Sequence, residues 1–434
     1  MKLFQQTRRV FLLLSILLIS AISTTALQAQ DFSRTRPDRL GFDRERLAQL
    51  DTVLQSYVDN EQIAGSVALI LRNGRIAYSS AKGMQDREAN IAMQENSMFR
   101  IASQTKAIIS TGIMILHERG DLQISDPLSK FFPAWANAKV AEANDSGSYD
   151  LVDLIRPINL RDLLTHTSGI GYGGFAGTGP ANQAWVDAGI TGWYLAGRTD
   201  GIQATVRKMA TLPQQAQPGE QWIYGYNLDI LGAVIEVASG KTLDVFLDEE
   251  IFTPLGMNDT HFFPPQEYAS RLTKVYRGKQ GGGIEPAPAV GSMQGQGEYL
   301  SGPRSTFSGG AGLLSTADNY ARFLQMTLNG GELNGVRILG PKTVELMTTD
   351  HLRQIPFNPG TGMGLGVSVL KDVGARGTMG SVGEYGWGGA YHSTYWVDPV
   401  ENLVVVYLTQ ILSPNPGLDD FSKLRAGLYS AIIE

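Results

Sequence analysis

The sequence contains no cysteine among its 434 residues. This absence excludes disulfide bonds, a thiolate nucleophile, cysteine-ligated metals and a lipobox-type lipid anchor. Histidine is scarce, with five residues, and there is neither a His-Glu-x-x-His zinc motif nor a Gly-x-Ser-x-Gly nucleophile elbow. The formal net charge is −6 and no basic run follows residue 46, so the footprint of a nucleic-acid-binding protein is missing. We therefore expect no metal and no nucleic-acid partner.

What the sequence does contain is typical of a globular protein. Apolar residues make up 43% of the chain and charged residues 18%, so the chain can bury a sizeable core. Its length favours two or three domains, or one large domain with an insertion.

Residues 1–29 have the pattern of an export signal. Basic residues precede an apolar run over residues 10–19, and small residues follow, with candidate cleavage sites after Ala26 and Ala29. The run is short for a stable membrane span, so we expect signal removal and a periplasmic or secreted protein. The twin-arginine and general secretory routes both stay open, and the strongly apolar run favours the general route. Residues 30–41 are expected to form a disordered leader.

A central stretch, residues 107–116, carries no charge, and its apolar side chains surround the whole helical circumference. Such a helix is buried in a large domain, and this one is too short to span a membrane. Ser103 and Lys106 stand at its amino end, spaced i, i+3 on one face. A lysine is unusual there, because the first turn of a helix favours acidic residues. The pair suggests an activated nucleophile beside a base or electrostatic partner; the alternative is that Ser103 caps the helix and Lys106 extends into solvent.

Strand signals at both ends of the chain, separated by helical patterns, indicate the fold class. Asn73-Gly74 between two apolar runs predicts a β-hairpin with a type I′ turn. We expect an α/β (α+β) fold in which one antiparallel sheet, flanked by helices, is built from both chain ends around an inserted, mainly helical domain. The predicted sheet domain covers residues 42–125 and 285–434, and the inserted domain covers 126–284. Helices are expected over residues 43–60, 228–238, 318–329 and 421–433, and strands over 66–71, 75–78, 393–397 and 403–408.

Several motifs, taken together, resemble one family. The chain resembles the serine β-lactamase and penicillin-binding-protein superfamily from about residue 42 to residue 434. Within it, the likeness is strongest to class C β-lactamases, D-alanyl-D-alanine peptidases and the carboxylesterases that share their fold. The matching segments are Phe99-Arg-Ile-Ala-Ser-Gln-Thr-Lys106, Gly120-Asp-Leu-Gln-Ile-Ser-Asp-Pro127, Leu163-Leu-Thr-His-Thr-Ser-Gly169, Pro218-Gly-Glu220, Leu231-Gly-x-x-Ile-Glu-x-x-x-Gly240, Gly309-Gly-Ala-Gly-Leu313 and Trp396-Val-Asp-Pro399.

The resemblance implies a role for each of these positions. Ser103 would be the nucleophile that forms an acyl-enzyme, with Lys106 one helical turn further on. Tyr224 would be the general base, as a phenolate or in concert with Lys106. The oxyanion hole would consist of the backbone N–H groups of Ser103 and Ala390. No metal or organic cofactor is implied. An ordinary core-packing role is the alternative for Tyr224 and for Trp387.

Two positions depart from the family pattern. Tyr226 stands where the second motif usually ends in asparagine, and Trp387 stands where the third motif usually begins with lysine or histidine. The missing residues hold the amide and carboxylate of a β-lactam, whereas an indole favours apolar acyl or alcohol groups. The chain therefore resembles the esterase branch, which often carries Trp-Gly-Gly. Substrate contacts are expected from Tyr226, Trp387, Gly388, Gly389 and, as a pocket wall, His392; the other four histidines are expected to be structural.

These features predict a serine hydrolase, a carboxylesterase for small or short-chain esters. A β-lactamase or D-alanyl-D-alanine peptidase of the same fold is the alternative, because an export signal would place the protein near peptidoglycan. A catalytically silent binding or sensor protein is the alternative from another class, since the asparagine and lysine landmarks are absent. The expected partner is a small-molecule ester, or else a β-lactam or peptide.

Overall fold

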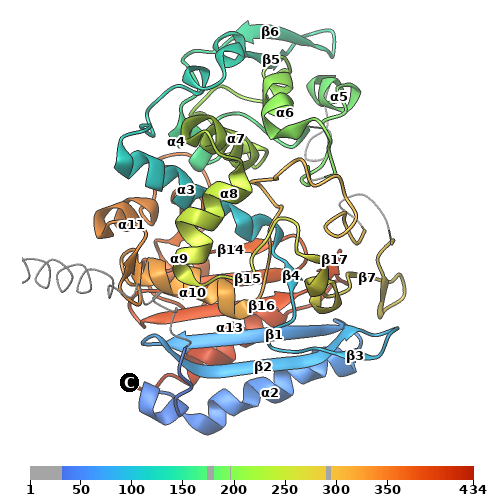
Figure 1. Cartoon of the computed structure of the whole chain (residues 1–434), viewed down its shortest axis with the longest axis vertical. Coiled ribbons are helices and arrows are strands. Elements are labelled where there is room, and N and C mark those ends of the chain that lie inside the picture. The colour runs from blue at the N-terminus through green and yellow to red at the C-terminus, as the bar shows by residue number, and fades with distance from the viewer. Residues whose placement is uncertain (1–31, 174–179, 196, 290–294) are drawn as a thin grey trace, which may run out of the picture. The chain divides into compact units, whose positions relative to one another are not determined.

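The computed structural model describes residues 32–173, 180–195, 197–289 and 295–434, and its main sheet combines the two ends of the chain (Figure 1). Every neighbouring pair of its strands is antiparallel, which confirms the predicted sheet. In spatial order the eight strands are β12 (Thr361–Met363), β13 (Ser368–Leu370), β14 (Tyr385–Gly389), β15 (Ser393–Asp398), β16 (Leu403–Thr409), β1 (Gly65–Arg72), β2 (Arg75–Asp86) and β3 (Ile91–Ala92).

The centre of the sheet joins residues from opposite ends of the sequence. All eight residues of β1 are buried, and the strand pairs with β16 on one side, from Ser66 opposite Thr409, and with β2 on the other. Asn73 and Gly74 connect β1 to β2 with φ angles of +51° and +69°, as a type I′ turn requires. The hairpin predicted from Asn-Gly is therefore present.

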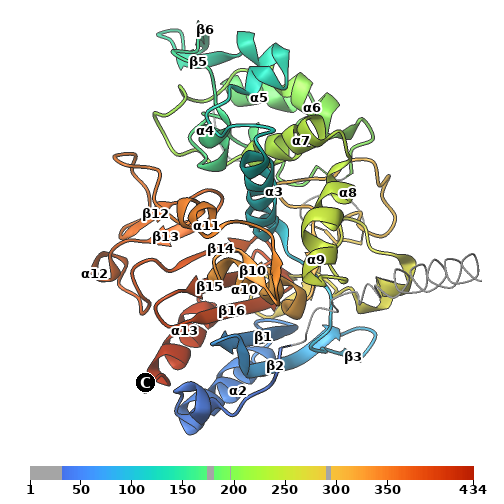
Figure 2. The same cartoon turned by 60° about the vertical axis from the view of Figure 1, so that its left-hand side comes forward.

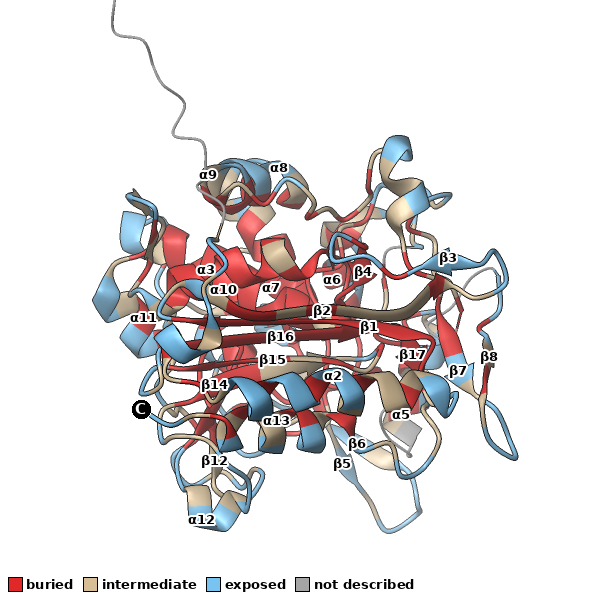
Figure 3. Ribbon diagram, turned by 90° about the horizontal axis from the view of Figure 1, so that it is seen from below, coloured by how far each residue is buried: buried red, intermediate tan, exposed pale blue. Residues whose placement is uncertain are grey.

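Helices cover both faces of the sheet (Figures 2 and 3). On one face, α2 (Arg44–Asp59) and α13 (Asp420–Ser430) pack against alternate residues of β1 such as Ile70. The other face, which includes Leu69, packs against α3 (Thr105–Arg119) and α10 (Ala317–Leu328). This alternation follows from the two-residue period of a strand. The predicted central helix is α3: its residues from Thr105 to Leu116 are buried, and it ends at Gly120, whose φ is +81°.

The segment between the two halves of the sheet is mainly helical but also contains strands. Its hairpin, β5 (Lys139–Ala143) and β6 (Tyr149–Asp153), was not predicted, because these strands are largely exposed and rich in charge. Residues 32–434 form one compact unit, and the domain boundaries at 126 and 284 stay a prediction. The helices here are α4 (Leu160–Leu164), α5 (Pro180–Asp187), α6 (Gly201–Met209), α7 (Asn227–Ser239), α8 (Leu243–Leu247) and α9 (Thr253–Leu255), and β7 (Tyr276–Gly278) and β8 (Ile284–Pro286) follow.

The remaining elements are short. They connect the larger helices and strands or pair locally with them. They are β4 (Phe99–Arg100), β9 (Leu314–Ser315), β10 (Glu332–Leu333), β11 (Val336–Arg337), β17 (Ile411–Leu412), α11 (Pro341–Met347) and α12 (Val373–Arg376).

The amino-terminal predictions have different outcomes. The export signal lies outside the described residues and stays a prediction. The expected disordered leader is wrong for its described part: Arg34 forms a β-bridge with Ile76, residues Pro37–Leu40 form a 3₁₀ turn, and Leu40 is buried. Burial of Leu40 beside α2 and α13 explains this order. Among the described residues, no helix is both long enough and apolar enough to cross a membrane.

Candidate active site

Ser103 lies in a 3₁₀ turn, Ala102–Gln104, that leads directly into α3. Ala102 has a left-handed φ of +43°, a conformation that is uncommon outside glycine and that clusters at functional sites. In the part of the chain that the structure describes, neither this turn nor α3 has a side-chain cap at its amino end. Ser103 is therefore not a helix cap, and its half-buried hydroxyl accepts a hydrogen bond from Lys106.

Lys106 is buried, with 1% of its surface exposed. Its ammonium donates to the Ser103 hydroxyl at 3.2 Å, to the Tyr172 hydroxyl at 3.2 Å and to the Gly310 carbonyl at 2.7 Å. The same nitrogen lies 4.6 Å from the centre of the Tyr224 ring. The alternative in which Lys106 extends into solvent is therefore wrong. A positive charge at this distance stabilises an alkoxide on Ser103 or a phenolate beside it.

Tyr224 and Trp387 contact each other at this site. The Trp387 Nε1–H donates a hydrogen bond of 3.2 Å to the Tyr224 hydroxyl, and the ring centres lie 5.7 Å apart. Both side chains are half-buried, so neither is an ordinary core residue. Trp222 also stacks on Tyr224, at 5.7 Å with an angle of 16° between the rings, which fixes the plane of the phenol.

Tyr172 is a site residue that the sequence analysis missed. Its hydroxyl receives the hydrogen bond from Lys106 although the side chain is buried. Burial raises the pKa of Tyr172 well above its ordinary value, and the neighbouring Tyr224 and Asp229 raise it further. A phenol in this environment holds its proton, so Tyr172 is better suited to orient the ammonium than to accept a proton. Its one signal in the sequence is its place three residues after the Leu163–Gly169 match.

A buried polar network positions the segment before Tyr172. Asn227, the first residue of α7, donates to His166 Nδ1 at 2.9 Å and to the Ile170 carbonyl at 3.1 Å, and it accepts from Ser168 at 2.5 Å. Asn227 lies one position after Tyr226, which occupies the usual asparagine position of the second motif. Its side chain is bonded to His166, Ser168 and Ile170, so it stabilises this segment and is not free to bind substrate. Burial lowers the pKa of His166 well below its ordinary value, and Lys106 lowers it further, so His166 is a neutral structural residue as expected.

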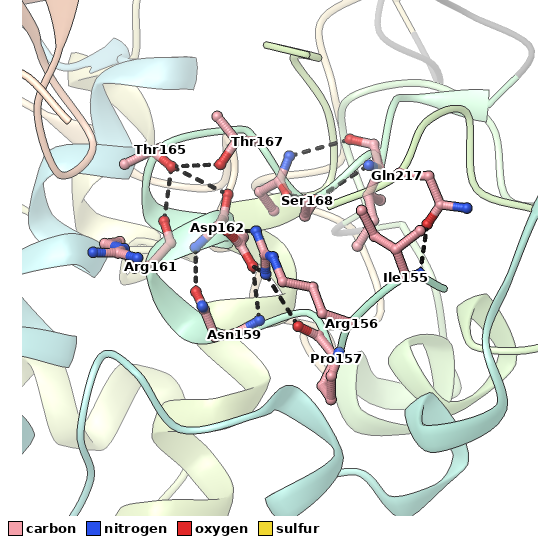
Figure 4. Close-up of polar contacts among 12 residues, drawn as sticks. Ile155, Arg156, Pro157, Asn159, Arg161, Asp162, Thr165, Thr167, Ser168 and Gln217 are labelled. Atoms are coloured by element: carbon pink, nitrogen blue, oxygen red, sulfur yellow. Dashed lines mark hydrogen bonds and ion pairs between the residues drawn. The ribbon is translucent and has the colours of Figure 1, made fainter. Parts of the chain in front are cut away.

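Helix α4 fixes the amino-terminal end of the segment that contains His166 (Figure 4). Asn159 caps α4 by accepting from the Asp162 N–H at 2.9 Å, and the Asp162 carboxylate accepts from the Asn159 N–H, also at 2.9 Å. Arg156 forms a two-bond ion pair with the same carboxylate, at 2.6 and 2.9 Å. Thr165 and Thr167 are joined by a hydrogen bond of 2.9 Å. These contacts hold both sides of His166.

Tyr226, expected to contact substrate, is buried with 0% of its surface exposed. Its ring stacks on Trp185 at 5.7 Å with an angle of 14°, and it meets Tyr172 edge-on at 5.0 Å. Tyr226 is therefore a packing residue between Tyr172 and Trp185, and its side chain is not exposed to a substrate. Its large apolar ring occupies the position at which the family usually has a short polar side chain.

The strand with the third motif lies against the turn that carries Ser103. A Cβ on Gly389 would come within 2.6 Å of the Ile101 carbonyl, so only glycine permits this close approach. Gln104 donates to the Ser393 hydroxyl at 3.0 Å, which ties the turn to β15. Ser103 and Ala390 are thus held on adjoining backbone segments, as a shared oxyanion hole requires. Gly388 is half-buried next to Trp387.

The His392 side chain does not lie beside Ser103 and Trp387. Its Nε2 lies 2.8 Å from Asp420 Oδ1, and its ring stacks on Phe421 at 4.1 Å, both residues of α13. Helix α13 covers the face of the sheet opposite to α3, so the side chain points away from Ser103. The prediction of a pocket wall conflicts with this placement, because His392 lies in the turn before β15 and its side chain contacts α13.

Asp229 is a second residue that the sequence analysis missed. Its Oδ1 accepts from the Ser308 hydroxyl at 2.7 Å and from the Gly310 N–H at 3.0 Å. The carbonyl of Gly310 in turn accepts from Lys106, so the carboxylate and the ammonium are linked through the two backbone polar groups of this one residue. Burial raises the pKa of Asp229, although these hydrogen bonds and Lys106 partly oppose that effect.

The raised pKa of Asp229 gives a test on stability. The folded protein holds this proton more tightly than the unfolded chain, so the free energy of unfolding falls as pH rises from about 4 through the folded pKa. Asp229→Asn keeps the Oδ1 acceptor and removes the charge. We expect the stability of the variant relative to wild type to increase between pH 4 and pH 7, measured by urea unfolding. Asp145→Asn, in an exposed loop, controls for the loss of one negative charge, and an equal pH trend in both variants would contradict the assignment.

A cavity of about 630 Å³ adjoins the site. Its lining includes Trp387 and Gly388 on β14, at the point where pairing with β13 has ended, and Phe357, which contacts Trp222 edge-on at 4.9 Å. The lining also includes the charged residues Glu384 and Arg425 but none of Ser103, Lys106 and Tyr224, so the cavity meets the site only along β14. In the described parts of the chain, no group of three acidic or histidine side chains is placed to hold a metal ion.

The fold and the site define a serine hydrolase of the Ser-x-x-Lys type. The family model described as Beta-lactamase matches residues 50–427, and the chain belongs to this family. It is 32% identical to Esterase EstB of Burkholderia gladioli over 83% of this chain and 90% of that protein. It is 25% identical to a putative D-alanyl-D-alanine carboxypeptidase of Escherichia coli K12, over 98% of each chain. Among solved structures, EstCE1, a hydrolase with promiscuous acyltransferase activity, superposes with a TM-score of 0.73 at 28% identity, covering 89% of this chain and 99% of that one.

Proposed function

We propose that this protein is a carboxylesterase that hydrolyses small or short-chain esters through an acyl-enzyme at Ser103. The observation that carries the proposal is the Trp387 indole, which replaces the cationic residue of the third motif and donates to the Tyr224 hydroxyl at 3.2 Å. An indole at this position offers an apolar surface to an ester and no charge to a carboxylate. The similarity to Esterase EstB supports the same substrate class.

The reaction uses the groups gathered around Ser103. Tyr224, acting as a phenolate beside the Lys106 ammonium, takes the hydroxyl proton as the Ser103 Oγ bonds to the ester carbon and the carbonyl π electrons move to the oxygen. The negative charge on the former carbonyl oxygen is stabilised by the N–H groups of Ser103 and Ala390, which are worth a few kcal/mol in such sites. Tyr224 returns the proton to the alcohol as the ester bond breaks. Water then repeats the sequence on the acyl-enzyme and releases the acid.

A comparison of two substrates tests this function. We expect the purified protein to hydrolyse p-nitrophenyl butyrate with a kcat/KM at least about tenfold above that for nitrocefin, since about 1.4 kcal/mol of lost carboxylate binding corresponds to tenfold. Faster turnover of nitrocefin would transfer the assignment to a β-lactamase. Turnover of D-alanyl-D-alanine peptides alone would favour the peptidase, which the Escherichia coli relative's name suggests.

A catalytically silent binding protein is the candidate from another class. The buried ammonium on the Ser103 hydroxyl argues against it, because a binding surface gains nothing from this contact. A fluorophosphonate probe separates the two. We expect the probe to label Ser103, and an unlabelled, folded protein would favour the silent member.

A further inference from the structure

The turn between β14 and β15 has a strained residue next to the proposed oxyanion donor. This turn consists of Ala390, Tyr391 and His392, between paired residues Gly389 and Ser393. His392 has a left-handed φ of +56°, which a β-carbon disfavours and which glycine would adopt without strain. A residue with a side chain persists there only if contacts elsewhere hold it.

The side-chain contacts that hold His392 come from α13. Asp420 Oδ1 lies 2.8 Å from His392 Nε2, and Asp420 is buried, with 1% of its side chain exposed. The same oxygen accepts from the Phe421 N–H at 3.0 Å, so the carboxylate is fixed by its own backbone. The Phe421 ring then covers the imidazole at 4.1 Å with an angle of 13°. The carbonyl of His392 accepts a short hydrogen bond from Thr409 on β16.

We propose that His392 and Asp420 form a clamp that fixes the position of the Ala390 N–H, which makes His392 a positioning residue for the oxyanion hole. The inference rests on the proposed acyl-enzyme chemistry at Ser103. Both ends of the turn are fixed, since Gln104 donates a hydrogen bond to Ser393 and Gly389 lies against Ile101. The clamp fixes the rest of the turn from the opposite face of the sheet.

The clamp matters because oxyanion stabilisation depends steeply on geometry. The donor must lie about 2.7–3.1 Å from the oxygen of the transition state, and a small displacement of the turn moves it out of that range. Such a displacement affects the transition state more than the bound ester. The signature is therefore a fall in kcat with an unchanged KM.

The test compares variants on both sides of the clamp. His392→Gly keeps the left-handed backbone and removes the tether, so we expect kcat for p-nitrophenyl butyrate to fall about tenfold with KM within twofold. Asp420→Ala should give the same loss, and Asp420→Asn, which keeps an oxygen acceptor, should retain most of the activity. The double variant should be no slower than either single variant. Asn402→Gly, at a left-handed residue in the next turn, is the matched control and should leave kcat unchanged.

Rates are normalised to the sites titrated by a fluorophosphonate, so misfolded protein does not enter kcat. Added imidazole should restore part of the activity of His392→Gly. Wild-type kcat in His392→Gly, or multiplying losses in the double variant, would overturn the clamp. If wild-type protein hydrolyses no ester, the proposed substrate fails, and the clamp is then tested by the rate of Ser103 phosphonylation. Slower phosphonylation in His392→Gly than in wild type supports the clamp, and an equal rate overturns it.

Discussion

Ser103→Ala is expected to lower kcat for p-nitrophenyl butyrate by at least about 10⁴-fold, the scale found when a serine nucleophile is removed from a preorganised site. The reason is that no other side chain occupies the position of the Ser103 hydroxyl at 3.2 Å from the Lys106 ammonium. The remaining groups can only bind the ester and polarise its carbonyl. Probe labelling should disappear together with turnover, and steady-state kinetics and mass spectrometry of the labelled protein measure both.

Ser110→Ala provides the control for Ser103→Ala. Ser110 lies in the same helix and is buried, and among the described residues its hydroxyl has no hydrogen-bond partner. Its removal should leave kcat and the unfolding temperature close to wild type. If Ser103→Ala kept more than about one tenth of the activity, the acyl-enzyme would be elsewhere and the proposed mechanism would be wrong.

Two tyrosines approach Lys106, and substituting each by phenylalanine assigns the base. We expect Tyr224→Phe to lower kcat by about 10³-fold, within the range of general-base contributions. Tyr224 is half-buried and accepts a hydrogen bond from Trp387, and its ring centre lies 4.6 Å from the ammonium, at the place of the base in the proposed mechanism. Tyr172→Phe should cost about tenfold, because the raised pKa of Tyr172 keeps the phenol protonated and it only orients the ammonium.

Each variant lacks one hydroxyl oxygen relative to wild type and keeps both aromatic rings, so the packing of the site is retained. The comparison is read on single-turnover acylation, which isolates the step that removes the Ser103 proton. A loss that is larger in Tyr172→Phe than in Tyr224→Phe would reverse the two roles. Equal large losses would mean that the two hydroxyls relay the proton together.

Local sequence signals predicted the main elements closely. The helix expected over residues 43–60 is α2, with Asp43 as its N-cap and Asn60 as its C-cap. The helix that begins at Asn227 ends at Gly240, where a left-handed glycine stops it. These elements follow short-range rules of capping and periodicity, which a single sequence contains. Strand signals at both chain ends predicted one sheet built from both ends, although no local signal specifies the register in which β1 pairs with β16.

The residues that were missed share a different property. Tyr172 and Asp229 reach Lys106 only because the chain folds back on itself, Tyr172 directly and Asp229 through Gly310. No spacing rule connects them to Ser103. Of the misplaced residues, Tyr226 was assigned from its position in the second motif and His392 from its place near the carboxyl end of the chain. Neither says which face of an element a side chain occupies. Ser103 and Lys106 were predictable because one helical turn places them together whatever surrounds the helix.

The pairing of the first long strand with one of the last has a consequence for synthesis of the protein. Strand β1 is entirely buried and largely apolar, yet its partner β16 emerges from the ribosome only near the end of translation. Until then the amino-terminal hairpin has an unpaired edge, which invites association with other chains. Closing so long a loop is also slow. We therefore expect a truncation before residue 403 to leave this edge of β1 unpaired and the chain prone to aggregation.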